Sequence, residues 1–93
     1  LIGCIYTDLG FEDEKEAGWY NAPWQWEAIK ANTGWVVQVH GEDDPYFDTT
    51  EPKFIRTQIG SELLVLPNRG HFLIEQNPTN NQFPEIVEII KSR

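Results

Sequence analysis

The hydrophobic residues of this chain gather in short runs that are separated by polar and charged stretches. Three of the runs are rich in β-branched, aliphatic or aromatic residues and are bounded by turn-forming residues, which is typical of strands. These runs are Leu1–Tyr6, Trp35–His40 and Ser61–Leu66. Pro67 and Asn68 stop the last run, and we therefore expect three strands.

The polar stretches between the runs carry helix signals. Asn21–Pro23 can start a helix, with Pro23 near its first position, and Asn32–Gly34 suits the C-terminal cap of that helix. Charged or amphipathic patterns predict further helical segments over Glu12–Gly18, Glu51–Gln58 and Pro84–Lys91. The stretch Glu75–Phe83, rich in Asn and Pro, is expected to be a polar loop.

The predicted strands and helices alternate along the chain, which indicates an α/β fold in which crossover helices join parallel strands. Parallel strands need helices on both faces, and three strands leave a thin sheet with an unpaired side. A chain of 93 residues forms one domain at most. We therefore expect residues 1–93 to be a single partial domain, the C-terminal half of a larger doubly wound sheet. The missing strands would pair with Leu1–Tyr6.

The charge balance excludes some functions. The chain has 15 Asp and Glu against 7 Lys and Arg, a net charge of -8. This argues against binding to nucleic acid or to an anionic membrane surface, because both attract cationic side chains. The opening apolar run is too short for a signal peptide or a membrane span. Cys4, the single cysteine, cannot form an internal disulfide, which fits a reducing compartment, and we expect a cytoplasmic location.

Two short motifs that follow predicted strands carry reactive side chains. Gly41–Pro45 comes after the second predicted strand and Gly70–Phe72 after the third. In open parallel sheets, reacting groups gather at the C-terminal ends of the strands. If the two strands are neighbours, about 4.8 Å apart, the Asp44 carboxylate can reach the His71 imidazole. The sequence thus predicts an acid and a base side by side.

Such a pair suits nucleophilic hydrolysis. Histidine can take a proton from a serine hydroxyl near neutral pH, and a carboxylate on its other nitrogen fixes the tautomer. In α/β-hydrolases the order along the chain is Ser, then Asp or Glu, then His. The only serines here, Ser61 and Ser92, lack the strand-to-helix setting of a nucleophile. We expect the nucleophile to lie upstream of Leu1.

The chain resembles the retinoblastoma-binding protein 9 family of serine hydrolases, a compact branch of the α/β-hydrolase superfamily with YdeN-like bacterial relatives. The resemblance covers nearly the whole chain. It is most specific at Tyr6-Thr7-Asp8-Leu9-Gly10, Pro23-Trp24-Gln25-Trp26-Glu27, Ile29-Lys30-Ala31-Asn32, Asp43-Asp44-Pro45 and Gly70-His71-Phe72.

The resemblance implies a fold and roles for two residues. The fold would be the C-terminal half of an α/β-hydrolase three-layer sandwich, in which Asp44 is the triad acid and His71 the base. The Gly-His-Ser-Ser-Gly nucleophile turn and the oxyanion hole would lie in the N-terminal half, which is absent here. The substrates would be small esters or amides, no cofactor is implied, and these 93 residues are not expected to be active alone. The Leu-x-Cys-x-Glu motif for which the family is named does not occur in the chain, so a retinoblastoma interaction does not carry over.

Trp24 and Trp26 have two interpretations. Large aromatic residues often fill the gap between a helix and a sheet, and this structural role is favoured. Alternatively, Trp24 or Trp26 lines the substrate pocket above the triad. The aromatic stretch follows the first predicted strand, so it would cover the catalytic edge.

Three alternatives stay open. The chain could be a non-catalytic binding module that keeps the fold without the nucleophile. A metal site could be built from His40, Glu42, Asp43, Asp44 and His71, although the three acidic residues lack a fixed ligand spacing. Cys4 could replace the serine, although a small apolar strand residue is its more ordinary role.

Overall fold

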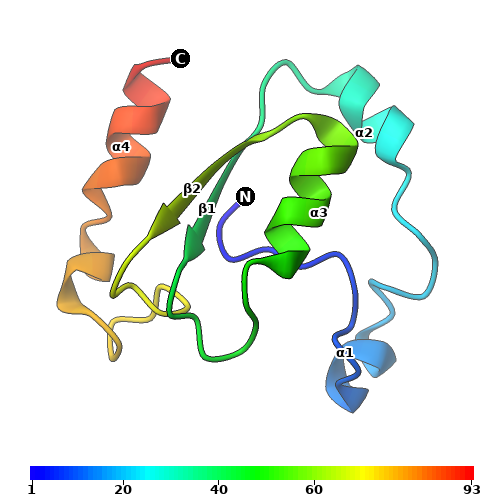
Figure 1. Ribbon diagram of the computed structural model, residues 1–93, viewed down its shortest axis with the longest axis horizontal. Coiled ribbons are helices and arrows are strands. Elements are labelled where there is room, and N and C mark those ends of the chain that lie inside the picture. Colours follow the sequence, from blue (N-terminus) through cyan, green and yellow to red (C-terminus); the bar gives the residue numbers. More distant parts are fainter.

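A computed structural model describes all residues from Leu1 to Arg93 (Figure 1). Its elements follow the order α1, α2, β1, α3, β2, a short 3-10 helix and α4. Their bounds are α1 Glu12–Ala17, α2 Trp26–Asn32, β1 Val37–Gly41, α3 Thr50–Ile59, β2 Glu62–Leu66, the 3-10 helix Pro78–Asn81 and α4 Pro84–Lys91. The predicted helices after residue 50 and the two later strands are therefore confirmed to within two residues at each end.

The sheet consists of β1 and β2, which are parallel neighbours joined by the crossover helix α3. Val37 pairs with Glu62 at one end of the ladder and Gly41 with Leu66 at the other. Every residue of β1 is buried, whereas β2 is only partly covered. The arrangement is the mixed helix and parallel-strand architecture expected of an α/β protein.

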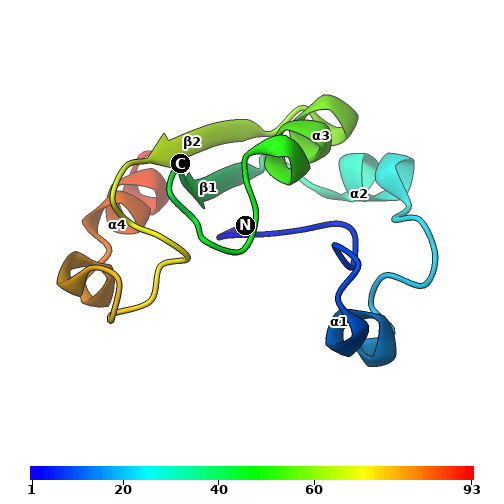
Figure 2. The same ribbon diagram turned by 60° about the horizontal axis from the view of Figure 1, so that its bottom comes forward.

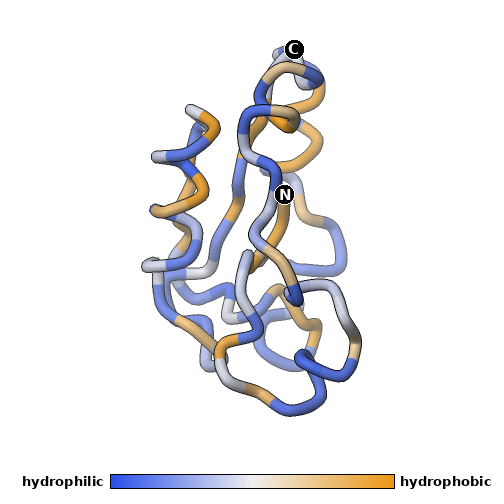
Figure 3. Tube along the Cα trace, turned by 90° about the vertical axis from the view of Figure 1, so that its right-hand side faces the viewer, coloured by the Kyte–Doolittle hydropathy of each residue, from blue (hydrophilic) through white to orange (hydrophobic).

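Alternation along β1 directs side chains to opposite faces. On one face, Gln38 donates its amide hydrogens to the carbonyl of Pro52 in α3, at 2.9 Å, and to the Ser61 hydroxyl, at 2.8 Å. On the other face, Val37 and Val39 share an apolar pocket with the isoleucines of α4. The helices α3 and α4 therefore lie on opposite sides of the strands, as Figures 1 and 2 show. Apolar stretches along the C-terminal helix stand out in Figure 3.

The first predicted strand, Leu1–Tyr6, is wrong as a strand. Ile2 forms one isolated parallel bridge to Val39, with Val39 N–H donating to Leu1 O at 2.8 Å and Gly3 N–H to Val39 O at 2.9 Å. Gly3 then adopts φ +54°, a left-handed conformation that ends the extended run. The parallel direction was predicted correctly, but the sheet has two strands rather than three.

The helix predicted to begin near Pro23 begins instead at Trp26. Trp26 N–H donates to Trp24 O at 3.0 Å, a tight turn that is incompatible with helix at this point. The Trp24 ring stacks on Tyr20, with centroids 6.5 Å apart. Local aromatic packing thus holds the segment before α2 in an irregular conformation. The predicted polar loop Glu75–Phe83 also differs in part, because it contains the 3-10 helix.

Buried polar groups outnumber buried hydrophobic side chains in this chain. Only 12 of 93 residues are buried, and the hydrophobic ones among them are Val37, Val39 and Ile55. The buried polar residues are Gln38, His40, Glu51, Ser61, Arg69 and Asn80. Specific hydrogen bonds therefore carry much of the positioning that a larger apolar core would supply elsewhere. None of the helices has the length and apolar character needed to cross a membrane.

Candidate active site

The loop after β1 presents Asp44. Asp44 N–H donates to Gly41 O at 3.1 Å, which turns the chain sharply at the strand end. Oδ1 of Asp44 accepts a hydrogen bond from Tyr46 N–H at 2.8 Å, a local turn for which Asp is well suited. These bonds leave the second carboxylate oxygen, Oδ2, for a contact outside the loop, and the Asp44 side chain is 0% exposed.

The loop after β2 presents His71 to that carboxylate. Nδ1 of His71 lies 2.7 Å from Oδ2 of Asp44. The two residues come from the C-terminal ends of neighbouring parallel strands, which is the juxtaposition that the order of elements predicted. The roles of Asp44 as the acid and His71 as the base stay predictions, with which this contact is compatible.

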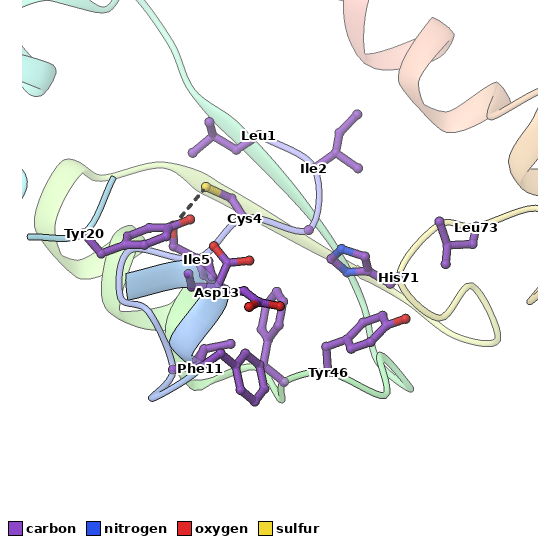
Figure 4. A pocket seen from close by; sticks show the side chains of 14 residues that line it. Leu1, Ile2, Cys4, Ile5, Phe11, Asp13, Tyr20, Tyr46, His71 and Leu73 are labelled. Carbon is purple, nitrogen blue, oxygen red and sulfur yellow. Dashed lines mark hydrogen bonds between the residues drawn. The ribbon is translucent and has the colours of Figure 1, made fainter. Parts of the chain in front are cut away.

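The other ring nitrogen of His71, Nε2, makes no hydrogen bond within the chain, and the side chain is 34% exposed. The imidazole lines an open cavity of about 880 Å³. Figure 4 shows His71 and Tyr46 on one side of this cavity and Cys4, Phe11 and Tyr20 of the N-terminal segment on the other. With Nδ1 engaged by a carboxylate, the neutral ring carries its lone pair on Nε2, where it can accept a proton.

Aromatic edges flank the imidazole. The rings of Tyr46 and Phe47 approach His71 in edge-to-face geometry, with centroids at 5.1 and 5.8 Å. Gly3 lies against the ring as well, since a Cβ at this position would be 3.1 Å from Cε1 of His71. The ring is thus confined by a carboxylate, two aromatic side chains and a backbone segment.

The two strand-end loops touch through their backbones. A side chain at Gly41 would collide with the carbonyl oxygen of Gly70, so this approach requires glycine. Gly70 N–H donates to Oδ1 of Asp43 at 2.9 Å. The contacts Asp43–Gly70 and Asp44–His71 both join residues 27 apart, so adjacent acidic residues hold adjacent positions of the opposite loop.

From the sequence, Asp43 was expected only as part of the Asp43-Asp44-Pro45 motif and of the alternative metal site, and Gln76, Arg69 and Asn80 were not identified. Oε1 of Gln76 accepts a hydrogen bond from His71 N–H at 2.6 Å. The doublet of aspartates opposite Gly70 and His71 was a usable signal for Asp43. Nothing in the local pattern pointed to the other three, because their contacts cross an irregular loop.

Trp24 and Trp26 lie in an aromatic cluster between α2 and α3. The Trp26 ring is 5.8 Å from Tyr6, 5.9 Å from Phe54 and 5.5 Å from Trp24, measured between centroids. Neither tryptophan lines the cavity beside His71. This packing fits the structural interpretation, and substrate binding by Trp24 and Trp26 stays a prediction that no contact in this chain supports.

His40 lies directly before the Asp44 loop and is buried. Neither ring nitrogen has a hydrogen-bond partner within 3.5 Å, and the ring centroid is 5.0 Å from that of Phe47. Burial lowers the pKa of His40 below its ordinary value, an effect that the nearby Asp44 carboxylate opposes. No three His, Cys, Asp or Glu side chains are grouped to hold a metal ion, so the alternative metal site is not assembled.

The remaining nucleophile candidates are also placed. Ser61 is buried just before β2, at the strand end opposite to His71, and its hydroxyl accepts a hydrogen bond from Gln38. The hydroxyl of Ser92, beyond α4, donates to Ile89 O at 2.9 Å. Cys4 lines the cavity, but burial raises the pKa of its thiol, which disfavours the reactive thiolate.

These observations define a class: a parallel α/β unit whose strand-end loops join a buried carboxylate to a half-exposed imidazole. No family model matches the chain. Serine hydrolase RBBP9 of Rattus norvegicus is 34% identical over 92 residues, which is 99% of this chain and 46% of that protein. The chain is similar to this serine hydrolase over nearly its whole length, which confirms the family resemblance, and it spans about half the length of that protein.

Proposed function

We propose that this chain supplies the acid and the base of a serine hydrolase that acts on small esters or amides. Asp44 orients the imidazole and His71 transfers protons. The serine nucleophile and the oxyanion hole belong to the other half of the hydrolase fold, outside these residues. The observation that carries the proposal is the 2.7 Å contact between His71 Nδ1 and Asp44 Oδ2, in a chain that is similar over 99% of its length to a serine hydrolase.

The proposed chemistry uses both nitrogens of the ring. Nε2 of His71 removes the proton of the serine hydroxyl while the serine oxygen attacks the substrate carbonyl. Asp44 stabilises the imidazolium that forms, through the hydrogen bond to Nδ1. The imidazolium then gives its proton to the departing alcohol or amine. Water attacks the acyl-enzyme by the same route in reverse, with His71 again as the base.

The proposal includes a complete α/β-hydrolase sandwich, in which further strands extend the sheet beside β1. Leu1–Gly3 pairs with β1 at one position only, so no strand follows the length of β1 on that side in this chain. Large hydrophobic side chains nearby are about half exposed or more, namely Leu1, Ile2, Trp35 and Ile90. An edge of this kind, flanked by exposed apolar side chains, favours additional strands and helices on that side.

The test is active-site labelling of the intact polypeptide that contains residues 1–93. A fluorophosphonate probe should label a serine outside these residues in the unmodified protein. His71→Ala should reduce the labelling rate by about 10³-fold or more, and Asp44→Asn strongly as well, because the base and its orientation are lost. Glu42→Gln, a change to an exposed carboxylate in the same loop, should leave the rate within about twofold.

Two outcomes would overturn the proposal. Labelling that is unaffected by His71→Ala and Asp44→Asn would remove these residues from catalysis. No labelling at all of a folded, intact polypeptide would instead favour the alternative of a non-catalytic binding module.

A further inference from the structure

Behind His71, a buried polar network joins the loop after β2, which carries His71, to α4. Asn80, in the 3-10 helix, is 8% exposed, and Arg69, at the start of the loop, is 5% exposed. The amide nitrogen of Asn80 donates to Arg69 O at 3.1 Å and to Leu73 O at 2.8 Å. These two carbonyls bracket the three residues Gly70–Phe72. One side chain therefore spans the segment that carries His71.

Arg69 fixes the orientation of the Asn80 amide. Nε of Arg69 donates to Oδ1 of Asn80 at 2.5 Å, so the amide oxygen faces the guanidinium and the amide nitrogen faces the loop. Nη1 of Arg69 donates to Oε2 of Glu85 in the first turn of α4 at 2.7 Å. The guanidinium also lies over the Phe83 ring, 4.8 Å from its centroid. Arginine suits this place because its planar fork can serve several acceptors at once.

The segment that Asn80 spans contains one strained residue, Phe72. Gly70 and Phe72, on either side of His71, have φ values of +57° and +62°. The left-handed conformation costs a residue other than glycine about 1–2 kcal/mol, and such strain persists only where the surroundings hold it. A loop released from its carbonyl contacts would relax, and the imidazole would move relative to Asp44.

We propose that Asn80, oriented by Arg69, is a positioning residue for His71. Its two donated hydrogen bonds hold the Gly70–Phe72 backbone so that Nδ1 stays on the Asp44 carboxylate and Nε2 points to the reacting serine. The inference deepens the proposed function and rests on it for the identity of the reaction. The contact between Asn80 and the loop carbonyls can be tested without it.

The decisive variant is Asn80→Asp in the intact polypeptide. It keeps the size and the oxygen that accepts from Arg69, but it replaces the donor of both loop bonds with an acceptor. We expect kcat for 4-nitrophenyl acetate to fall about 10- to 100-fold, because small misplacements of catalytic groups have effects of this size. KM should stay within about twofold, since the substrate contacts are unchanged. Asn81→Asp is the matched control, because it makes the same change at the exposed neighbouring position, and it should leave both constants within about twofold.

A spectroscopic measurement separates positioning from general stability. The proton between His71 Nδ1 and Asp44 should give a low-field NMR resonance, assigned by its loss in His71→Ala. In Asn80→Asp this resonance should weaken or exchange faster while circular dichroism shows a folded protein. A folded Asn80→Asp variant with the kcat and the resonance of Asn81→Asp would overturn the inference.

Asn80→Ser decides the matter if the aspartate variant does not fold. Its hydroxyl can donate to one of the two carbonyls, so we expect a smaller loss of kcat and a partly weakened resonance. A folded serine variant with unchanged kcat and resonance would overturn the inference. If the unmodified protein is not labelled by a fluorophosphonate, the proposed function fails, whereas the resonance still reports whether Asn80 positions His71.

Discussion

The corner where the loops after β1 and β2 meet and the N-terminal third of the chain, residues 1–34, are held in different ways. In the corner, consecutive hydrogen bonds join Asp43 to Gly70 and Asp44 to His71. The N-terminal third contains no buried residue in either of its helices. Its side chains contact the rest of the protein mainly through exposed or half-exposed aromatic rings.

The N-terminal third is attached at few polar points. Leu1–Gly3 hydrogen-bonds to β1, and Thr7 hydrogen-bonds to Glu51 of α3. The acid and the base are therefore positioned by hydrogen bonds between the two strand-end loops, whereas the cavity wall opposite His71 is held by a few anchors. Substitutions in the two regions should therefore have distinct effects on stability and on the site.

The largest effect is expected at Gly41 in the corner. In Gly41→Ala the new methyl group would collide with the Gly70 carbonyl, and both partners are backbone atoms that cannot swing away. We expect a loss of about 3 kcal/mol in the free energy of unfolding, measured by urea titration, together with loss of fluorophosphonate labelling.

Gly34→Ala is the control for this prediction. Nothing lies within 4 Å of a Cβ at Gly34, so the change should alter stability by less than about 0.5 kcal/mol. Equal stability of the two alanine variants would mean that the loops do not meet as closely as this structure has them.

The second prediction concerns the anchor of the N-terminal third. Oε1 of Glu51 accepts hydrogen bonds from the Thr7 backbone, at 3.2 Å, and from the Thr7 hydroxyl, at 2.5 Å, and Glu51 is buried. Glu51→Ala should lower the free energy of unfolding by about 2 kcal/mol, because hydrogen bonds to a charged acceptor are lost. Limited proteolysis should then cut residues 1–25 faster. Glu51→Gln keeps an acceptor oxygen and should reduce the free energy of unfolding less. Equal resistance to proteolysis in the unmodified protein and the two variants would show that the Thr7–Glu51 contact is not an anchor.

The corner was also the region that the sequence predicted best. The runs of β-branched residues located β1 and β2, and their order made them parallel neighbours. Once the strands are neighbours, the loops that follow them open at one edge of the sheet, so Asp44 and His71 had to come close. These inferences use local patterns and one topological rule, which is why they needed no knowledge of the rest of the fold.

The remainder depended on non-local contacts that a sequence pattern does not contain. Leu1–Tyr6 has the composition of a strand, yet a strand forms only where a neighbour pairs with it, and Gly3 turns the chain away after one bridge. The interactions of Arg69 and Asn80 cross an irregular loop, where neither helical nor strand periodicity applies. Their burial, not their spacing, identifies them.

The third prediction is that stability depends on pH through His40, which is buried next to the corner. Burial lowers the pKa of His40 from its ordinary value of 6.5. The unfolded chain then binds a proton more readily than the folded protein as the pH falls below 6.5, so the free energy of unfolding should decrease with decreasing pH in that range.

His40→Phe tests the origin of this dependence. It removes two ring nitrogens that lack hydrogen-bond partners. We therefore expect the free energy of unfolding to increase by about 1 kcal/mol at neutral pH. Urea titrations at pH values above and below the ordinary pKa of His40 should also show a weaker pH dependence than in the unmodified protein. An unchanged dependence would assign the effect to other groups.

The smallest effect is expected at Trp19 in the N-terminal third. Its side chain is 78% exposed, so Trp19→Ala should change the free energy of unfolding by less than about 0.5 kcal/mol. Trp26→Ala is the matched comparison, because it removes the same side chain from a cluster with Tyr6 and Phe54, and it should cost about 2 kcal/mol or more. A larger loss at Trp19 than at Trp26 would mean that the N-terminal third packs through a surface that lies open here, and the contrast with the corner would not hold.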